Sequence, residues 1–160
     1  MLKGLGKTVI KTERLNIRIA SDDEMAALIA EQTEEELKIA YGEMLAQSKA
    51  NPQQRQWYAM WFVELPSGER IGELCFMGLS DEGKTEIGYG LLPKFWGKGY
   101  ASEAVKAVTE WAVKQGVKTV EAETDAENIA SQKVLSKAGF MPTGEIGEEG
   151  PRFALFADKA

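Results

Sequence analysis

A glycine-rich stretch between an apolar segment and an amphipathic segment constrains the fold of this chain more than any other feature. The apolar segment covers residues 87–92, and the amphipathic segment covers residues 100–113. Gly97 and Gly99 lie between them, one residue apart. Glycine adopts backbone conformations that strain other residues, so the pattern predicts a strand, a tight turn and the start of a helix. The unpaired N–H groups and partial positive charge at a helix start bind anions, which predicts a site for a phosphorylated cofactor.

The size and composition of the chain indicate one globular domain. A chain of 160 residues is long enough to bury a sizeable core, and we expect residues 1–160 to form a single domain. Hydrophobic residues make up 44% and charged residues 28%, which is typical of a water-soluble protein. The sequence has neither an apolar stretch of membrane-spanning length nor the apolar segment of a signal peptide. We therefore expect a cytoplasmic location and no membrane partner.

The rare residue types exclude several kinds of chemistry. Histidine is absent, and Cys75 is the only cysteine. This removes a disulfide framework, histidine metal sites and histidine-based catalytic triads, so we expect no metal. A general base must then be a carboxylate, a lysine, a tyrosine or a water molecule. The net charge of −6 disfavours a nucleic-acid partner, and it either favours cationic partners or serves solubility alone.

Hydrophobic periodicity predicts an α+β fold with the element order β-α-α-β-β-β-α-β-α-β-β. Capping boxes at Ser21 and Thr33, each with a glutamate three residues later, mark two helix starts. Further helices are expected at residues 100–113 and 128–138. The expected strands are residues 12–20, 57–64, 71–77, 85–92, 117–123, 140–146 and 152–157. A strand–helix–strand crossover in the middle of the chain predicts one parallel seam in a mostly antiparallel sheet.

Three phosphate ligands compete for the glycine-rich turn. A P-loop needs Gly-x-x-x-x-Gly-Lys-Ser/Thr, and that spacing is absent. A dinucleotide-binding turn needs a third glycine or alanine where this chain has Ser102, and it follows strands of a different topology. An acyl-coenzyme A site is the third interpretation. Binding of ATP or NAD in place of coenzyme A stays an alternative.

Two segments of the chain resemble the signatures of the GNAT superfamily of acetyltransferases. The first, Lys94-Phe95-Trp96-Gly97-Lys98-Gly99-Tyr100-Ala101, resembles the family's Arg/Gln-x-x-Gly-x-Gly/Ala, with lysine in the first place. The second, residues 128–140, resembles the segment Asn-x-x-Ser/Ala…Lys-x-Gly-Phe. Thr-Glu-Arg-Leu at residues 12–15 and Glu-Ile-Gly-Tyr at residues 86–89 resemble the ribosomal-protein N-acetyltransferase branch. The resemblance spans residues 12–156.

The resemblance implies a GNAT-like fold and acetyl-CoA as cosubstrate. The expected sheet is mixed and mostly antiparallel, with a central pair of parallel strands that splay apart, and it is flanked by helices. The backbone around Gly97 and Gly99 would hold the pyrophosphate, while the amides of the pantetheine arm would pair with the opened strand edge. A backbone N–H near Leu91 or Leu92 would hold the thioester oxygen during transfer. The implied cofactor-binding residues are Leu91, Leu92, Lys94, Trp96, Gly97, Lys98, Gly99, Tyr100, Ala101, Asn128 and Ser131.

The implied reaction is direct acetyl transfer to a primary amine. Glu86 matches approximately the position from which relatives activate the amine through water, and a solvated glutamate at a strand end fits the pattern equally well. Glu73 is the rival base. Ser131 is either a hydrogen-bond donor to the sulfur or an ordinary helix-surface serine. Leu135 stands where many relatives carry a tyrosine general acid, so that acid is missing.

The sequence leaves the acceptor and a rival function open. The acceptor amine is expected to be cationic, either a protein N-terminus or a small polyamine or antibiotic amine. Residues 34–36 are three glutamates that either attract such an acceptor or complement a helix dipole. Trp57 and Trp61 either line the substrate cleft or belong to the core, and Cys75 is expected to be a core thiol. The rival class is a non-catalytic acyl-CoA-binding sensor. The protein is expected to be a monomer or a homodimer.

Overall fold

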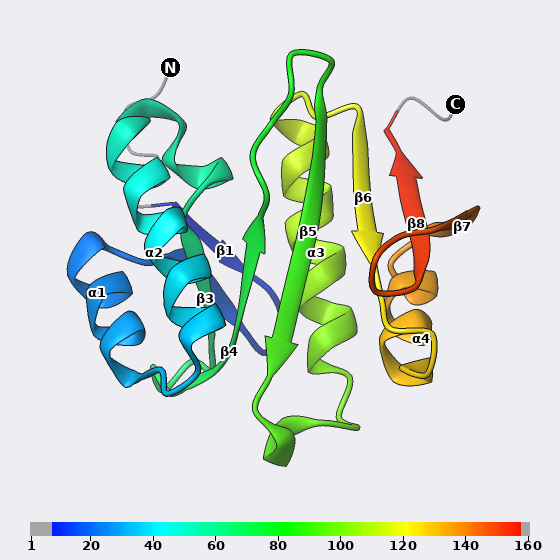
Figure 1. Cartoon of the computed structure of the whole chain (residues 1–160). Coiled ribbons are helices and arrows are strands. Elements are labelled where there is room, and N and C mark those ends of the chain that lie inside the picture. Colours follow the sequence, from blue (N-terminus) through cyan, green and yellow to red (C-terminus); the bar gives the residue numbers. More distant parts are fainter. Residues whose placement is uncertain (1–7, 158–160) are drawn as a thin grey trace.

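Eight strands and four α-helices form the part of the chain that the computed structural model describes, residues 8–157 (Figure 1). The strands are β1 (Val9–Lys11), β2 (Asn16–Ile19), β3 (Met60–Glu64), β4 (Arg70–Phe76), β5 (Lys84–Leu91), β6 (Thr119–Glu123), β7 (Met141–Ile146) and β8 (Pro151–Phe156). The α-helices are α1 (Asp22–Glu31), α2 (Glu35–Ala50), α3 (Tyr100–Lys114) and α4 (Ile129–Lys137). Two short 3-10 helices are η2 (Pro52–Trp57) and η3 (Pro93–Phe95).

One sheet joins the eight strands in the order β1-β2-β3-β4-β5-β6-β8-β7. Neighbouring strands run antiparallel except β5 and β6, which are parallel. These two strands pair only at three positions, from Lys84 opposite Thr119 to Glu86 opposite Glu121, although β5 continues to Leu91. The expected α+β fold, a mostly antiparallel sheet with a splayed parallel pair at its centre and flanking helices, is confirmed.

The helices cover both faces of the sheet (Figure 1). Helices α1 and α2 pack together on one face, and α3 and α4 lie on the other. Val105, Val108 and Ala112 recur at helical spacing on α3 and are completely buried against the sheet. This packing anchors α3, and it thereby holds the glycine-rich turn that precedes the helix at the end of β5.

Four aromatic rings form the centre of the core on the α3 side. The rings of Trp57, Trp61, Phe76 and Trp111 have centroid separations between 5.0 and 6.1 Å. Trp57 is 3% exposed and Trp61 is 0% exposed, so both belong to the core and do not line a cleft. The two residues also do not share a strand, because Pro52 opens a 3-10 helix that ends at Trp57 and β3 starts only at Met60.

The first expected strand, residues 12–20, is wrong in its extent. Only β2, Asn16–Ile19, lies within this range, and the residues before it form a tight turn that joins it to β1, Val9–Lys11. In this turn Thr12 N donates to Leu15 O at 2.9 Å, and Leu15 N donates to Thr12 Oγ1 at 3.0 Å. A threonine hydroxyl that bonds the nearby backbone competes with strand pairing. The alternation of apolar residues that starts at Leu15 gives no sign of this turn, so it could not predict where the strand begins.

One of the two expected capping boxes forms. Ser21 and Glu24 exchange side-chain and backbone hydrogen bonds at the start of α1, as predicted. The box expected at Thr33 is wrong: α2 starts one residue later, with Glu34 in the cap position, and the Glu34 side chain makes no capping bond. The capping pattern in a sequence therefore marks this second helix only to within a residue.

Candidate active site

The glycine-rich turn has the backbone shape that the sequence predicts. Strand β5 ends at Leu91, η3 follows, and the chain then turns through Gly97 with a φ of 77° and Gly99 with a φ of 84°. Both angles lie in the left-handed region, where a side chain is strained. Gly99 is the N-cap of α3 and provides no side-chain acceptor. The first N–H groups of α3 therefore remain available to an anion.

A cavity of about 480 Å³, here called the turn cavity, opens beside this turn. The end of β5, the turn, the first residues of α3 and helix α4 line it. It brings together eight of the eleven residues expected to bind the cofactor: Leu91, Trp96, Gly97, Gly99, Tyr100, Ala101, Asn128 and Ser131. A Cβ atom at Gly97 would meet nothing within 4 Å, so the backbone there is open to a ligand.

Three of the expected cofactor residues do not line the turn cavity. Lys94 Nζ instead lies 3.5 Å from a carboxylate oxygen of Glu69. The Leu92 N–H donates to Ile71 O at 2.9 Å, so this candidate donor to the thioester oxygen is already engaged. The carbonyl oxygen of Lys98 accepts a hydrogen bond from Arg14.

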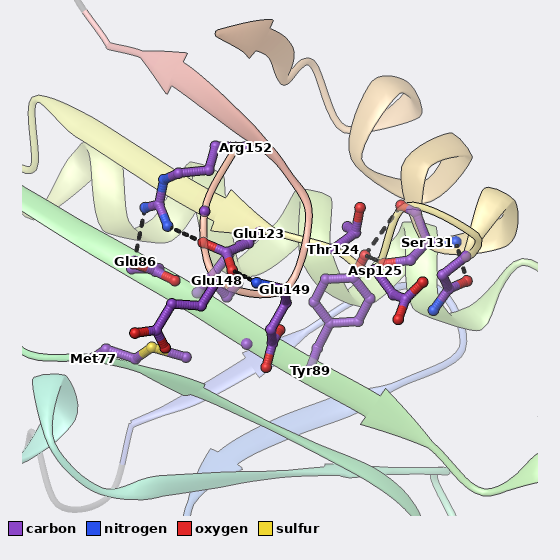
Figure 2. Close-up of a pocket in the computed structure, with 14 residues that line it drawn as sticks. Met77, Glu86, Tyr89, Glu123, Thr124, Asp125, Ser131, Glu148, Glu149 and Arg152 are labelled. Atoms are coloured by element: carbon purple, nitrogen blue, oxygen red, sulfur yellow. Dashed lines mark hydrogen bonds and ion pairs between the residues drawn. The ribbon is translucent and has the colours of Figure 1, made fainter. Parts of the chain in front are cut away.

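A second cavity of about 720 Å³, here called the acidic cavity, adjoins the first (Figure 2). The middle of β5, the end of β6, the start of α4 and the turn between β7 and β8 line it. Its charged lining residues are Glu86, Glu123, Asp125, Glu148, Glu149 and Arg152. Five carboxylates thus face one guanidinium, which gives this cavity a negative potential that attracts cations.

Arg152 organises the carboxylates of the acidic cavity (Figure 2). Its Nη2 atom lies 3.0 Å from Glu86 Oε1 and 2.8 Å from Glu121 Oε1, and its Nη1 atom bonds Glu123. The hydrogen bond to Glu86 has the largest effect on the pKa of the guanidinium and raises it. The bonds to Glu121 and Glu123 raise this pKa further, and burial opposes them. The arginine therefore stays charged and holds the three carboxylates in place.

The turn between β7 and β8 is tied to the end of β6. Glu149 N donates to Glu123 Oε2 at 2.6 Å, and this backbone hydrogen bond, with Arg152, lowers the pKa of Glu123. A Cβ atom at Gly150 would lie 2.3 Å from Thr124 O, so only glycine fits the close backbone approach there. These contacts hold Glu148 and Glu149 against the acidic cavity (Figure 2).

The two cavities meet at Tyr89, Asn128 and Ser131, which line both. Tyr89 Oη lies 2.6 Å from Ser131 Oγ and 3.2 Å from Ser131 O (Figure 2). Ser131 N donates to Asn128 Oδ1 at 3.0 Å, which places Asn128 at the cap of α4. Burial raises the pKa of Tyr89, while the bond to Ser131 opposes the shift. The phenol therefore stays protonated at neutral pH.

Tyr89 is the site residue that sequence reasoning missed. Its signal was present, because it ends the Glu-Ile-Gly-Tyr sequence and stands three residues after Glu86. What the sequence did not reveal is that Tyr89 lies where β5 no longer pairs with β6, and that its side chain there contacts Ser131 on α4. Leu135, at the position where the family resemblance implies a tyrosine, is completely buried.

The remaining candidates lie outside both cavities. Glu73 stands opposite Gly90, and Cys75 stands opposite Gly88, in the β4–β5 register. Burial raises the pKa of the Glu73 carboxyl, with Arg70 opposing the shift. Burial also raises the pKa of the Cys75 thiol to about 11, which suits the inert thiol that the sequence predicts. The glutamates at residues 34–36 line neither cavity, and the acidic lining comes from β5, β6 and the β7–β8 turn.

A membrane-spanning helix and a metal-binding cluster are both absent from the part of the chain that the structure describes. Within residues 8–157, no helix is both long and apolar enough to span a membrane. The same residues contain no cluster of three or more cysteine, aspartate or glutamate side chains arranged to hold a metal ion.

Comparisons with known proteins agree on one family. A family model described as "Acetyltransferase (GNAT) domain" matches residues 10–141. The uncharacterized N-acetyltransferase YoaA of Bacillus subtilis is 28% identical over 151 residues, which cover 86% of this chain and 85% of YoaA.

Solved structures extend the agreement to the fold. The ribosomal-protein-S5-alanine acetyltransferase of Vibrio fischeri superposes with a TM-score of 0.76 at 17% identity, over 95% of this chain and 98% of that one. RimL, a ribosomal L7/L12 alpha-N-protein acetyltransferase solved in complex with coenzyme A, superposes with a TM-score of 0.68 at 20% identity. That match covers 93% of this chain and 98% of RimL.

Proposed function

The chain belongs to the GNAT family of acetyltransferases, and on that premise we propose that it transfers an acetyl group from acetyl-CoA directly to a primary amine of a cationic acceptor. One observation carries the proposal: the turn cavity and the acidic cavity meet at Tyr89, Asn128 and Ser131. The first has the open backbone and helix start that suit a pyrophosphate. The second has the carboxylates that suit an ammonium group. Transfer takes place where they meet.

The splay of the sheet supports an extended cofactor between the two cavities. Beyond Glu86, strand β5 has no paired residue on β6, and its edge faces the gap. Coenzyme A supplies a thioester at the end of an arm of amides, and such an arm pairs with a free strand edge as an added strand does. Asn128, at the start of α4, offers an amide that both donates and accepts from the other side.

The residues at the junction have the chemistry that aminolysis of a thioester requires. An alkylammonium with a pKa near 10 must lose a proton, and we assign this proton to Glu86 through a water molecule. As the amine nitrogen bonds to the acyl carbon, the carbon–sulfur bond breaks and the thiolate needs a proton. The Tyr89 hydroxyl, bonded to Ser131, supplies it and is reprotonated from solvent.

The charge of the acidic cavity supports an acceptor that carries positive charge beyond its reacting nitrogen. Five carboxylates line it, and Arg152 neutralises only part of their charge. A small polyamine and a protein N-terminus followed by basic residues both fit this pattern. Attraction between exposed charges weakens with salt, so we expect the KM of the acceptor to rise with ionic strength.

Thiol release from acetyl-CoA tests the proposed function. The acceptors are a short peptide with a free N-terminus, a polyamine, an aminoglycoside and a neutral monoamine. We expect release with the cationic acceptors and little with the neutral one. Tight binding of acetyl-CoA without turnover for any amine would instead favour the acyl-CoA sensor. Stabilisation of the protein by ATP or NAD and not by coenzyme A would favour a nucleotide site.

The substitution Glu86→Gln tests the assignment of the base. We expect turnover to fall on the order of 100-fold at a pH below the pKa of the acceptor amine, with acetyl-CoA affinity nearly unchanged. Glu121→Gln is the matched control, because Glu121 also binds Arg152 but lines neither cavity. A wild-type pH–rate profile in Glu86→Gln would move the base to Glu73 or to water.

A further inference from the structure

Arg14 contacts the glycine-rich turn from outside the turn cavity, and we propose that it is a positioning residue for the phosphate-binding turn. The inference rests on the proposed function, because it takes the turn to be the site of the coenzyme A pyrophosphate. Arg14 lies in the turn between β1 and β2, far from Gly99 along the chain. Neither cavity includes it among its lining residues.

The first part of the contact ties Arg14 to the start of α3. Arg14 Nε donates to Glu103 Oε1 at 2.7 Å, and Arg14 N donates to Glu103 Oε2 at 2.9 Å. Thr12 Oγ1 donates to the same Oε2 atom at 2.5 Å. Burial alone would raise the pKa of Glu103, but these hydrogen bonds lower it. The carboxylate is therefore ionised and fully engaged by the β1–β2 turn.

The second part of the contact reaches the glycine-rich turn itself. Arg14 Nη1 donates to the carbonyl oxygen of Lys98 at 3.0 Å, and that carbonyl lies between the two left-handed glycines. The guanidinium carbon lies 4.3 Å from the centroid of the Tyr100 ring. Arg14 Nη2 is the atom that a Cβ atom at Gly99 would meet, at 3.3 Å. One guanidinium thus contacts three consecutive residues of the turn.

Glycine gives the turn its shape but not its rigidity. Gly97 and Gly99 reach left-handed angles without strain, and the same freedom lets the turn adopt many other conformations. A turn held in its binding shape before the ligand arrives avoids the ordering cost at the moment of binding. The bond from Arg14 to Lys98 O supplies this restraint at the residue between the glycines.

Charge gives a second reason for an arginine at this position. Glu103 lies in the first turn of α3, where a bound pyrophosphate would otherwise meet a negative carboxylate. The ion pair with Arg14 compensates that charge, and the guanidinium keeps its Nη2 edge toward Gly99. Arg14 belongs to the Thr-Glu-Arg-Leu segment that resembles the ribosomal-protein N-acetyltransferase branch. The proposed role of this segment is to hold the glycine-rich turn at the cofactor site.

Arg14→Ala tests this inference when two acetyl donors are compared. Acetyl-CoA carries the pyrophosphate, whereas S-acetylpantetheine carries the same thioester and arm without it. We expect the KM for acetyl-CoA to rise about tenfold or more, because the loss of a charge-assisted hydrogen bond weakens binding by roughly this factor. We expect kcat to stay within about twofold of the wild-type value. The KM for S-acetylpantetheine should not change. Equal losses with both donors would show that Arg14 only stabilises the fold, and would overturn the inference.

Arg18→Ala is the matched control. Arg18 lies four residues from Arg14, binds two carboxylates, Glu24 and Glu64, and lies over the Phe62 ring. Its loss should lower the melting temperature as much as the loss of Arg14 and leave both KM values unchanged. Arg14→Lys keeps the charge but not the fork that reaches both Glu103 and Lys98, so it should recover little of the acetyl-CoA affinity.

Calorimetric binding of coenzyme A separates this inference from the proposed function. Wild-type protein that binds coenzyme A, with an Arg14→Ala variant that binds it more weakly, supports both. Equal binding by the two proteins overturns the role of Arg14 and leaves the proposed function standing. A wild-type protein that does not bind coenzyme A overturns both.

Discussion

Tyr89 on β5 and Ser131 on α4 are 42 residues apart in the sequence, and their hydroxyls lie within hydrogen-bond distance. The pair lies where the two cavities meet, and the proposed mechanism assigns to it the proton for the departing thiolate. The pKa of Tyr89 is raised by burial above the ordinary value of 10. A donor must be protonated to act, and the raised pKa keeps it so throughout neutral and mildly alkaline pH. On the alkaline side, the wild-type rate should therefore fall only above the ordinary tyrosine pKa of 10.

Tyr89→Phe keeps the ring and removes the proton. We expect kcat to fall on the order of 100-fold, with little change in acetyl-CoA affinity, and the alkaline limb of the pH–rate profile to disappear. Tyr58→Phe, at a tyrosine that lines neither cavity, is the control and should behave as wild type. If Tyr89→Phe retained wild-type kcat, Ser131 or water would have to supply the proton.

At the scale of elements, the opening of the sheet follows from unequal strand pairing. Strand β6 pairs with β8 over all five of its residues, from Thr119 to Glu123, but with β5 over only three. Strand β5 is held in turn by β4, from Gly72–Leu91 to Phe76–Ile87. Each central strand therefore follows its antiparallel neighbour, and the two separate beyond Glu86. The separation leaves the edge of β5 beyond Glu86 without a partner on β6, which is the edge that the proposed cofactor arm requires.

The β7–β8 turn is the element that gives the acidic cavity its wall, and Gly150→Ala tests it. The added Cβ would lie 2.3 Å from Thr124 O and 2.7 Å from Ala126 N, so the backbone must move. We expect a loss of stability of about 1–3 kcal/mol and a higher KM for the acceptor, with acetyl-CoA affinity unchanged. Steady-state kinetics with each substrate varied in turn, and denaturant unfolding, measure these effects.

Gly144→Ala is the matched control for the β7–β8 turn. Gly144 lies on the same hairpin and has a φ of 89°, but a Cβ atom there would meet nothing within 4 Å. The Gly144→Ala substitution should lower the stability of the protein through backbone strain and leave the KM of the acceptor unchanged. An acceptor KM that rose equally in both variants would mean that strain, and not displacement of the wall, is responsible.

At the scale of the whole molecule, ionised carboxylates connect different elements of the fold at three separate places. Hydrogen bonds from Arg18 lower the pKa of Glu24 from 4.5 to about 2, with burial opposing the shift. The hydrogen bond from the Glu149 N–H is the largest cause that lowers the pKa of Glu123. Burial would raise the pKa of Glu103, but the hydrogen bonds that Thr12 and Arg14 donate to this carboxylate outweigh burial and lower it. Glu24 joins α1 to β2, Glu123 joins β6 to the β7–β8 turn and β8, and Glu103 joins α3 to the β1–β2 turn.

These shifts predict the direction of acid unfolding. A carboxylate whose folded pKa lies below its unfolded pKa contributes stability that is fully present above the unfolded value. For Glu24 that contribution should disappear as the pH falls from about 4.5 to about 2. We therefore expect a melting temperature that is steady from pH 7 to about 5 and then falls steeply, as measured by thermal scans across this range.

Glu24→Gln should melt below wild type at pH 7 and approach it as the pH nears 2, because both proteins then lack the ionised group. Glu36→Gln, at an exposed position on α2, is the control and should follow the wild-type curve. A constant offset between Glu24→Gln and wild type at every pH would contradict the linkage.

The sequence by itself determined the local structure of this protein and the family to which it belongs. The glycine-rich turn, the capping box of α1 and the buried face of α3 are set by interactions within a few residues, so their patterns can be read along the chain. The mixed sheet followed from a strand–helix–strand order. The same local reasoning missed β1, because the turn that follows it is held partly by hydrogen bonds that Thr12 and Arg14 donate to the distant Glu103.

Only the tertiary structure decided which of these residues meet. Arg152 reaches Glu86 across 66 residues, and Tyr89 reaches Ser131 across 42. Placing β8 between β6 and β7, and parting β5 from β6, put these side chains around two adjoining cavities. Periodicity and propensity report what a residue does to its near neighbours in the chain. The contacts that shape the candidate site depend on strand order and helix packing, which are properties of the whole fold.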